Sequence, residues 1–226
     1  MALTRRSGVI LHPSSLPGPD GIGDLGPDAY HWLDFLAETG CSLWQVLPLG
    51  PTGYGDSPYQ CFSAFAGNPY LISPLLLLDQ KLLSTRDLAD RPIFPERNVD
   101  FGAVIDWKIT LLDRAYSKFN NLNGQKLKEE YLAFCQKQKP WLDDFALFMA
   151  IKGHLGCGSW KDWPVELRTR EPLALTAFEE AHAVEVDKQK FRQFLFFSQW
   201  ANIRAYSRQK GIQIIGDIPI FVAYDS

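Results

Sequence analysis

The stretch Ser42-Leu43-Trp44-Gln45-Val46-Leu47-Pro48-Leu49 decides the class of fold. It is short, apolar and followed by Gly-Pro, which predicts a buried strand. A shorter apolar run at residues 8–12 predicts an earlier strand. Between them a helix is predicted over about 27–39, because Pro27 suits a first helical turn and Gly40 a C-terminal stop. Strand, helix and strand in this order form a βαβ unit, so we expect an α/β fold with a parallel sheet.

Further along the chain, a long loop and a helical stretch precede a third strand. Residues 50–70 are rich in Gly and Pro, and irregular loops of this length are uncommon unless they are functional. Apolar residues keep helical spacing from 76 to 186, with a new helix expected to open at Pro140. A long, buried helix over about 186–210 then leads into a strand at 212–215. We therefore divide the chain into a start with two strands and the loop (1–75), a helical insertion subdomain (76–186), and a helix with the third strand (187–226).

The number of predicted strands is small for a parallel sheet. Parallel sheets need helices on both faces, and three strands leave two unpaired edges. The sequence ends shortly after the third strand, at Ser226. We therefore expect this chain to be the front of a larger α/β domain and prone to aggregate through its open edges.

Composition excludes several classes of function. The chain of 226 residues has a formal net charge of −3 and no Lys/Arg cluster, so we expect no nucleic-acid partner. It has no apolar run of about 18 residues, so we expect no membrane span. The apolar run near the N-terminus is too short for a signal peptide, which favours a cytoplasmic location. The four Cys and four His residues are scattered, which argues against a metal site.

One glycine-rich motif suggests a nucleotide cofactor. Gly21-Ile22-Gly23-Asp24-Leu25-Gly26 has the G-x-G-x-x-G spacing of dinucleotide-binding folds. In those folds the motif follows the first strand directly, and an acidic residue ends the second strand. Here residues 13–20 intervene, and the second strand ends in Leu47-Pro48-Leu49. We therefore expect no dinucleotide.

Several blocks of sequence resemble the amylomaltase, or disproportionating-enzyme, family of 4-α-glucanotransferases. The strongest block runs from Trp44 through Gly50-Pro51-Thr52-Gly53-Tyr54-Gly55-Asp56-Ser57-Pro58-Tyr59-Gln60 and continues to Tyr70. His12-Pro13-Ser14-Ser15-Leu16-Pro17-Gly18-Pro19 is similar to the opening motif of the family. Residues 141–148, 196–200 and 216–223 agree in the same order. The resemblance covers essentially the whole chain and less than the first half of a family member.

The resemblance implies a fold and a reaction. It implies the first three strands of a (β/α)8 barrel, with the helical insertion between strands 2 and 3. It also implies transfer of α-1,4-glucan segments, including maltooligosaccharides, by a retaining mechanism with a carboxylate nucleophile and a carboxylic acid. The resemblance implies no organic cofactor and no metal. The nucleophile of the family lies in an Arg-Ile-Asp-His type of motif that this sequence lacks. We therefore assign no catalytic residue, expect those groups beyond Ser226, and expect the chain alone to be inactive.

Four residues are candidates for substrate binding. Asp217 follows the third strand, where barrel enzymes place functional groups, and the resemblance implies contact with the sugar at the cleavage site. Tyr59 and Ser57 match positions that line donor subsites, where a ring stacks on a sugar and a hydroxyl orients it. Tyr54 matches a secondary glucan contact. From position alone, Asp217 equally suits a hydrogen bond in the turn before Pro219, and Tyr59 suits packing within its loop.

Two other classes of protein remain to be distinguished. A non-catalytic maltooligosaccharide-binding module would suit the seven Trp and eight Tyr residues, and it would fold stably alone and bind sugar without converting it. A helical interaction scaffold built on residues 76–186 would leave the loop at 50–70 unexplained. The sequence does not indicate an oligomeric state.

Overall fold

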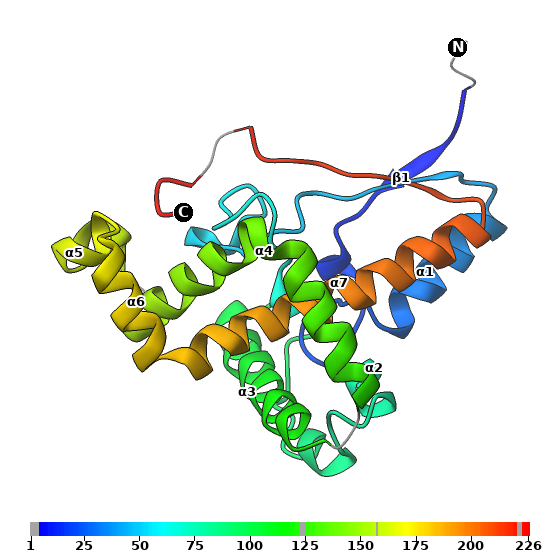
Figure 1. Ribbon diagram of the computed structural model, residues 1–226. Coiled ribbons are helices and arrows are strands. Elements are labelled where there is room, and N and C mark those ends of the chain that lie inside the picture. Colours follow the sequence, from blue (N-terminus) through cyan, green and yellow to red (C-terminus); the bar gives the residue numbers. More distant parts are fainter. Residues whose placement is uncertain (1–4, 123–124, 157, 221–222) are drawn as a thin grey trace.

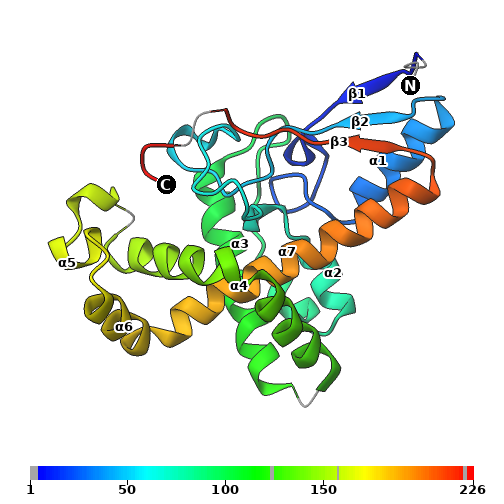
Figure 2. The ribbon, with the colours of Figure 1, turned by 45° about the horizontal axis from the view of Figure 1, so that its top comes forward.

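The computed structural model describes residues 5–122, 125–156, 158–220 and 223–226, except for the side chain of Tyr54. Within this part the strands β1 (Gly8–Ile10), β2 (Leu43–Gln45) and β3 (Gln213–Ile215) form one parallel sheet in the order β1-β2-β3. Figure 2 shows β2 between its two neighbours. The predicted parallel βαβ arrangement is therefore confirmed. The strands are shorter than predicted, and Pro48 has no N–H with which to extend the ladder of β2.

Two helices cover one face of the sheet. Helix α1 (Pro27–Glu38) connects β1 to β2, and helix α7 (Ala183–Gln209) leads into β3 (Figure 2). Trp44 of β2 is fully buried in the core with apolar residues of both helices. Its indole nitrogen donates to the carbonyl of Leu11 at 2.8 Å. The sequence predicts this layer correctly because its signals are local ones.

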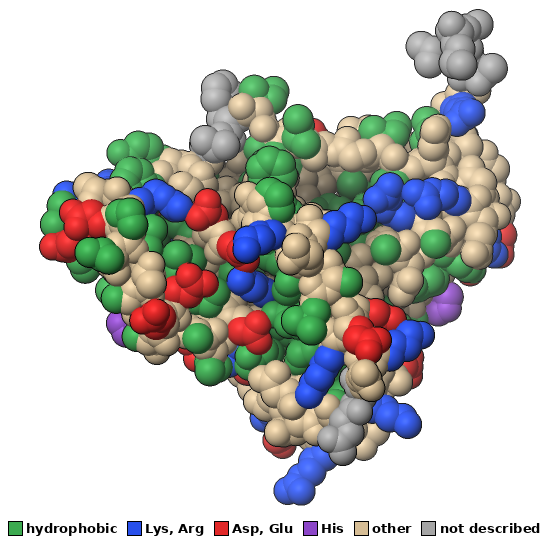
Figure 3. Space-filling view, in the orientation of Figure 1, with side chains coloured by type: hydrophobic (Ala, Val, Ile, Leu, Met, Phe, Trp, Pro, Cys, Tyr) green, Lys and Arg blue, Asp and Glu red, His purple; other side chains and the backbone are tan. Residues whose placement is uncertain are grey.

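No helix covers the opposite face of the sheet within the described residues (Figure 2). Ile10 is 62% exposed and Ile215 is 41% exposed, although both lie in strands. Figure 3 shows apolar side chains along the upper edge of the molecule, where Figure 1 shows β1 and the C-terminal segment. Ile218 and Ile220 of that segment are also exposed. An apolar sheet face of this kind is normally covered by further structure.

Residues 76–186 are mostly helical, as predicted. The helices between β2 and α7 are α2 (Pro74–Asp79), α3 (Phe101–Asn121), α4 (Gln125–His154), α5 (Val165–Arg168) and α6 (Pro172–Ala181). Short 3-10 helices lie at Pro13–Ser15, Tyr54–Asp56, Pro69–Leu71, Thr85–Leu88 and Trp160–Asp162. Helices α3 and α4 pack on α7 through aromatic rings, and the ring centroids of Phe119 and Phe191 lie 4.7 Å apart. A smaller apolar cluster under α5 and α6 joins residues such as Ile151, Trp163 and Val186.

The predicted helix start at Pro140 is wrong, because Pro140 lies inside the 30-residue helix α4. A proline inside a helix removes one hydrogen bond and costs about 3 kcal/mol. Packing on both sides of the proline offsets this cost. Tyr131 packs its ring against Phe194 of α7, and Leu142 is fully buried beyond the proline. Local helix signals could not reveal this tertiary support.

Candidate functional site

The candidate site lies where β2 and β3 end. Tyr59 is in the loop that follows β2, and Asp217 lies two residues after β3. The Tyr59 hydroxyl donates to Oδ2 of Asp217 at 2.7 Å, although the two residues are 158 positions apart. This hydrogen bond raises the pKa of Tyr59 above its usual value. The parallel sheet thus brings together two residues that the sequence singled out separately.

Asp217 has a second partner in its own turn. Its Oδ1 accepts from the backbone N–H of Ile218 at 2.8 Å, so the turn interaction suggested by its position also exists. Tyr59 and Asp217 border an open pocket of about 410 Å³, with Gln60 and residues 218–220. A carboxylate has about four lone-pair sites, and these two bonds use two of them. Asp217 therefore keeps acceptor capacity on the pocket side.

Ser57 acts on the backbone next to Tyr59. Its hydroxyl oxygen accepts from the N–H of Tyr59 at 3.3 Å. The tip of the loop is left-handed at two residues, with φ angles of 67° at Gly55 and 52° at Asp56. Glycine adopts this conformation freely, whereas it is uncommon for a residue with a side chain such as Asp56. Burial raises the pKa of the Asp56 carboxyl. The side chain of the fourth candidate, Tyr54, lies outside the described residues.

The loop after β2 is more ordered than its composition suggests. Gly53 N–H donates to the carbonyl of Gln60 at 2.8 Å, and Thr52 and Cys61 form an antiparallel bridge. Phe62 N–H donates to the carbonyl of Pro51 at 3.0 Å. These bonds fold the loop back on itself like a hairpin. Tyr59 therefore lies in a loop whose backbone is held in place by its own hydrogen bonds.

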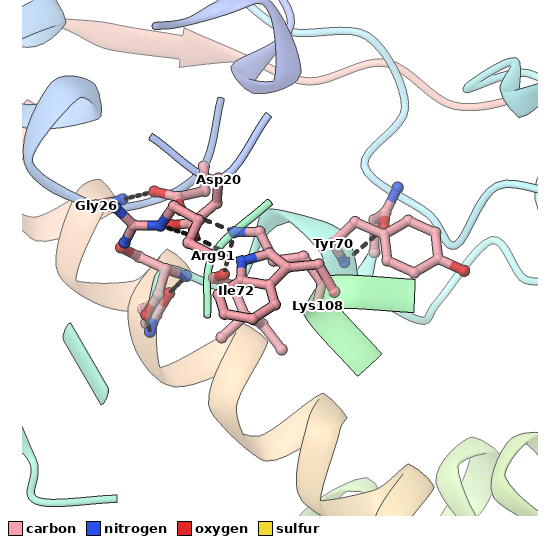
Figure 4. A network of polar contacts seen from close by, with 11 residues as sticks. Asp20, Gly26, Tyr70, Ile72, Arg91 and Lys108 are labelled. Atoms are coloured by element: carbon pink, nitrogen blue, oxygen red, sulfur yellow. Dashed lines mark hydrogen bonds and ion pairs between the residues drawn. The ribbon is translucent and has the colours of Figure 1, made fainter. Parts of the chain in front are cut away.

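A buried polar network supports the base of this loop (Figure 4). Lys108 of α3 donates to Oδ2 of Asp24 at 2.9 Å and to the carbonyl of Ile72 at 3.0 Å. Asp20, fully buried, accepts from the indole of Trp107 at 2.8 Å and from Arg91 at 3.0 Å. The network ties the segment before α1 and the segment after the loop to the same helix.

The same network explains the glycine-rich motif at 21–26. The carboxylate of Asp24 accepts from the N–H of Gly26, the N-cap residue of α1, at 2.9 Å. At Gly23, an added Cβ would lie 2.2 Å from the carbonyl oxygen of Pro13, so the glycine permits a close backbone crossing. The motif therefore has a structural explanation in this chain.

His12 lies two residues beyond β1, and Gln45 is the last residue of β2. The half-buried His12 forms a hydrogen bond through Nδ1 with the Ser14 hydroxyl at 2.6 Å, and burial lowers the pKa of His12. Gln45 lies in β2 and is half-buried. Among the described residues, no group of three or more His, Cys, Asp or Glu side chains could hold a metal ion. No helix in that same part of the chain is long and apolar enough to cross a membrane.

The polar residues that sequence reasoning missed lie in helices. Lys108 of α3 and the buried Gln193 and Gln199 of α7 all bond to backbone groups beside the loop. In the sequence, such a residue can be recognised as a polar side chain within the apolar stripe of a predicted helix. A polar side chain that is buried there needs a hydrogen-bond partner. This pattern predicts burial and bonding but cannot name the partner.

The fold and the site define an α/β protein with a tyrosine–carboxylate pair at the ends of neighbouring parallel strands. Comparison with known proteins then gives the family: the 4-alpha-glucanotransferase family matches residues 11–226, and this chain belongs to it. The chain is 49% identical to the 4-alpha-glucanotransferase of Thermus thermophilus, covering 100% of this chain and 44% of that protein. It is 46% identical to the 4-alpha-glucanotransferase of Synechocystis sp., covering 98% of this chain and 44% of that protein.

A solved structure is similar over the same extent. The amylomaltase from Streptococcus agalactiae in complex with acarbose superposes with a TM-score of 0.94 at 38% identity, covering 99% of this chain and 45% of that one. The chain therefore has an α/β fold similar to that of amylomaltase. It spans about 44% of the length of the Thermus thermophilus and Synechocystis relatives.

Proposed function

We propose that this chain is the N-terminal, sugar-binding part of a 4-α-glucanotransferase, which moves α-1,4-glucan segments between glucan chains with retention. The observation that carries the proposal is the 2.7 Å hydrogen bond between Tyr59 and Asp217 beside an open pocket. The family match over residues 11–226 supports the reaction. The acarbose complex of the similar amylomaltase supports a carbohydrate as the ligand.

Each candidate residue has a defined role in this proposal. The exposed ring of Tyr59 stacks on a pyranose ring, as aromatic side chains do in sugar sites. Asp217 accepts hydrogen bonds from sugar hydroxyls with the lone pairs that Tyr59 and Ile218 leave free. Ser57 fixes the backbone of Tyr59 and offers its own hydroxyl to the ligand. Tyr54 makes a secondary glucan contact.

The proposal includes an architecture. The three strands are the first of a (β/α)8 barrel, and the exposed Ile10 and Ile215 belong to a sheet face that further barrel structure would cover. Residues 1–75 and 187–226 are barrel segments, and residues 76–186 are an insertion subdomain. The nucleophile and the acid/base belong to motifs outside these 226 residues, so the chain alone does not transfer glucan. The proposed reaction uses no cofactor, and we place it in the cytoplasm.

The test combines a product assay with a binding assay. The purified chain is incubated with maltotriose, and products are separated to look for glucose and a ladder of longer oligosaccharides. Binding of maltotriose is measured by calorimetry for the chain, for Tyr59→Ala and for Tyr224→Ala, an exposed tyrosine of the C-terminal segment that does not border the pocket.

We expect binding without products. Tyr59→Ala should weaken binding at least about tenfold, the equivalent of about 1.4 kcal/mol, because it removes the stacking ring. Tyr224→Ala should bind like the original chain. A product ladder would refute the proposed inactivity of the chain. Equal binding of maltotriose by all three proteins would refute the proposed sugar site at Tyr59.

The alternative is a non-catalytic maltooligosaccharide-binding module. This alternative is favoured because both residues of the Tyr59–Asp217 pair belong to this chain. The two proposals differ in stability. A module should be a soluble monomer that unfolds cooperatively, whereas the barrel segment should associate through its uncovered apolar sheet face. Sedimentation analysis with denaturant unfolding distinguishes them.

A further inference from the structure

Two glutamines of α7 each bind both backbone polar groups of one residue. Gln193 accepts from the N–H of Gly67 at 2.7 Å and donates to the carbonyl of Gly67 at 2.9 Å. Gln199 accepts from the N–H of Ser73 at 2.7 Å and donates to the carbonyl of Ser73 at 3.2 Å. Both side chains are no more than 2% exposed. Each carboxamide therefore acts as a two-point clamp on the backbone.

The first clamp lies at the end of the loop that carries Tyr59. Gly67 directly precedes Asn68, whose N–H donates to the carbonyl of Leu49 at 2.7 Å, where the loop begins. An added Cβ at Gly67 would lie only 1.9 Å from Cδ1 of Phe196, so the loop end approaches α7 as closely as glycine allows. The clamp and the glycine together fix the loop end on α7.

The same helix also determines the position of Asp217. Helix α7 ends at Gln209 and continues into β3 at Gln213, and Asp217 follows two residues after β3. Gly67 and Asp217 also line one small cavity of about 220 Å³, together with Phe196 and Trp200 of α7. Helix α7 therefore positions both residues of the site hydrogen bond. It holds the loop of Tyr59 through the clamp on Gly67, and it connects to Asp217 through β3.

We propose that Gln193 is a positioning residue for the Tyr59–Asp217 pair. Its clamp on Gly67 holds the loop at the height along α7 at which the Tyr59 hydroxyl reaches Asp217. The involvement of that pair in sugar binding rests on the proposed function, whereas the clamp itself does not. Without Gln193, the N–H and the carbonyl of Gly67 lose their side-chain partner in a buried place, so the loop end must move to find others.

Gln199 provides a matched control on the same helix. It has the same chemistry and burial, but Ser73 lies beyond the 3-10 helix Pro69–Leu71, farther from Tyr59 along the chain. The neighbouring backbone is also held independently, because Leu71 accepts from Leu25 N–H at 2.9 Å and Ile72 accepts from Lys108 at 3.0 Å. Loss of Gln199 should therefore remove similar hydrogen bonds without moving Tyr59.

The test measures the pKa of Tyr59 by NMR in chain labelled with 13Cζ-tyrosine, with Tyr59→Phe to assign the signal. We expect Gln193→Met to lower the pKa of Tyr59 toward its value in Asp217→Asn, while Gln199→Met leaves it unchanged. Amide exchange at Gly67 should become at least about tenfold faster in Gln193→Met only. An unchanged pKa of Tyr59 in Gln193→Met, or equal shifts in both variants, would overturn the proposal.

A measurement on the unaltered chain covers the case in which Gln193→Met does not fold. The Gly67 amide should then exchange as slowly as amides in the middle of α7, and exchange at the rate of exposed loop amides would overturn the clamp. Maltotriose titration of the same samples separates this inference from the proposed function. If the pKa of Tyr59 changes as expected but maltotriose does not bind, the proposed sugar site is refuted and the positioning role of Gln193 is still supported.

Discussion

Replacement of Lys108 by methionine tests the network under the loop. The Lys108 side chain is only 1% exposed, and its partner Asp24 is 12% exposed. Lys108→Met keeps a long unbranched stem but removes the ammonium group from Asp24 and from the carbonyl of Ile72. Removing one partner of a buried ion pair costs about 3–5 kcal/mol, because the other charge stays buried and unpaired. That is a large part of the roughly 5–15 kcal/mol that stabilises a typical domain.

The assay is denaturant unfolding followed by circular dichroism, with Arg170→Met as the matched control. Arg170 pairs with Asp144 at 2.6 Å, but the two side chains are 58% and 69% exposed. An exposed pair contributes less than about 1 kcal/mol because water and salt screen it. The double variant Lys108→Met with Asp24→Asn should recover part of the loss, since it leaves no uncompensated charge. If Lys108→Met lowers the free energy of unfolding no more than Arg170→Met does, the network does not support the loop.

Two further predictions concern a glycine and a histidine. Gly67→Ala should destabilise the chain by about 1–3 kcal/mol because the added Cβ would meet the ring of Phe196. Gly153→Ala in α4, where an added Cβ would have nothing within 4 Å, should stabilise the chain by up to about 1 kcal/mol. Thermal unfolding compares the two variants, and equal changes in stability would contradict the close contact at Gly67. Burial lowers the pKa of His12 in the folded chain, so the unfolded chain binds the proton more readily and stability should fall as pH drops below about 6.5. Unfolding midpoints measured between about pH 7 and 5.5 should fall in the original chain and fall less in His12→Gln. The same dependence of stability on pH in both proteins would refute the assignment to His12.

The sheet and its covering helices could be predicted because their signals are local. Pro27 begins α1, Gly40 follows its end with a φ of 74°, and apolar runs mark the strands. The parallel order then follows from the handedness and spacing of βαβ units. The family resemblance added the identities of Tyr59 and Asp217 as site candidates. Parallel topology placed both at the same end of the sheet, but only the three-dimensional structure shows that their side chains meet.

The remaining features depend on contacts between segments that are distant in the sequence. Pro140 is tolerated inside α4 because residues on both sides of it pack on other helices, which no local rule detects. Gln193 and Gln199 could be recognised as buried polar residues, but their partners lie 126 positions away. The tertiary fold selects among many possible acceptors and donors, so sequence pattern alone could not identify Gly67 and Ser73.

Helix α7 connects these features into one physical account of the site. Phe191 packs against rings of α3 and α4, Gln193 clamps the loop end, and the last turn of α7 leads to β3 and Asp217. Residues two positions apart lie about 200° apart around a helix, so Phe191 and Gln193 act on different faces of α7. Substitution of Gln193 should change the geometry of the Tyr59–Asp217 pair, because Gln193 holds the end of the loop that carries Tyr59. Substitution of Phe191 should instead lower the stability of the helical stretch, since its ring contacts are with α3 and α4. Comparing Phe191 and Gln193 variants by the pKa of Tyr59 and by the free energy of unfolding tests this separation between the two faces.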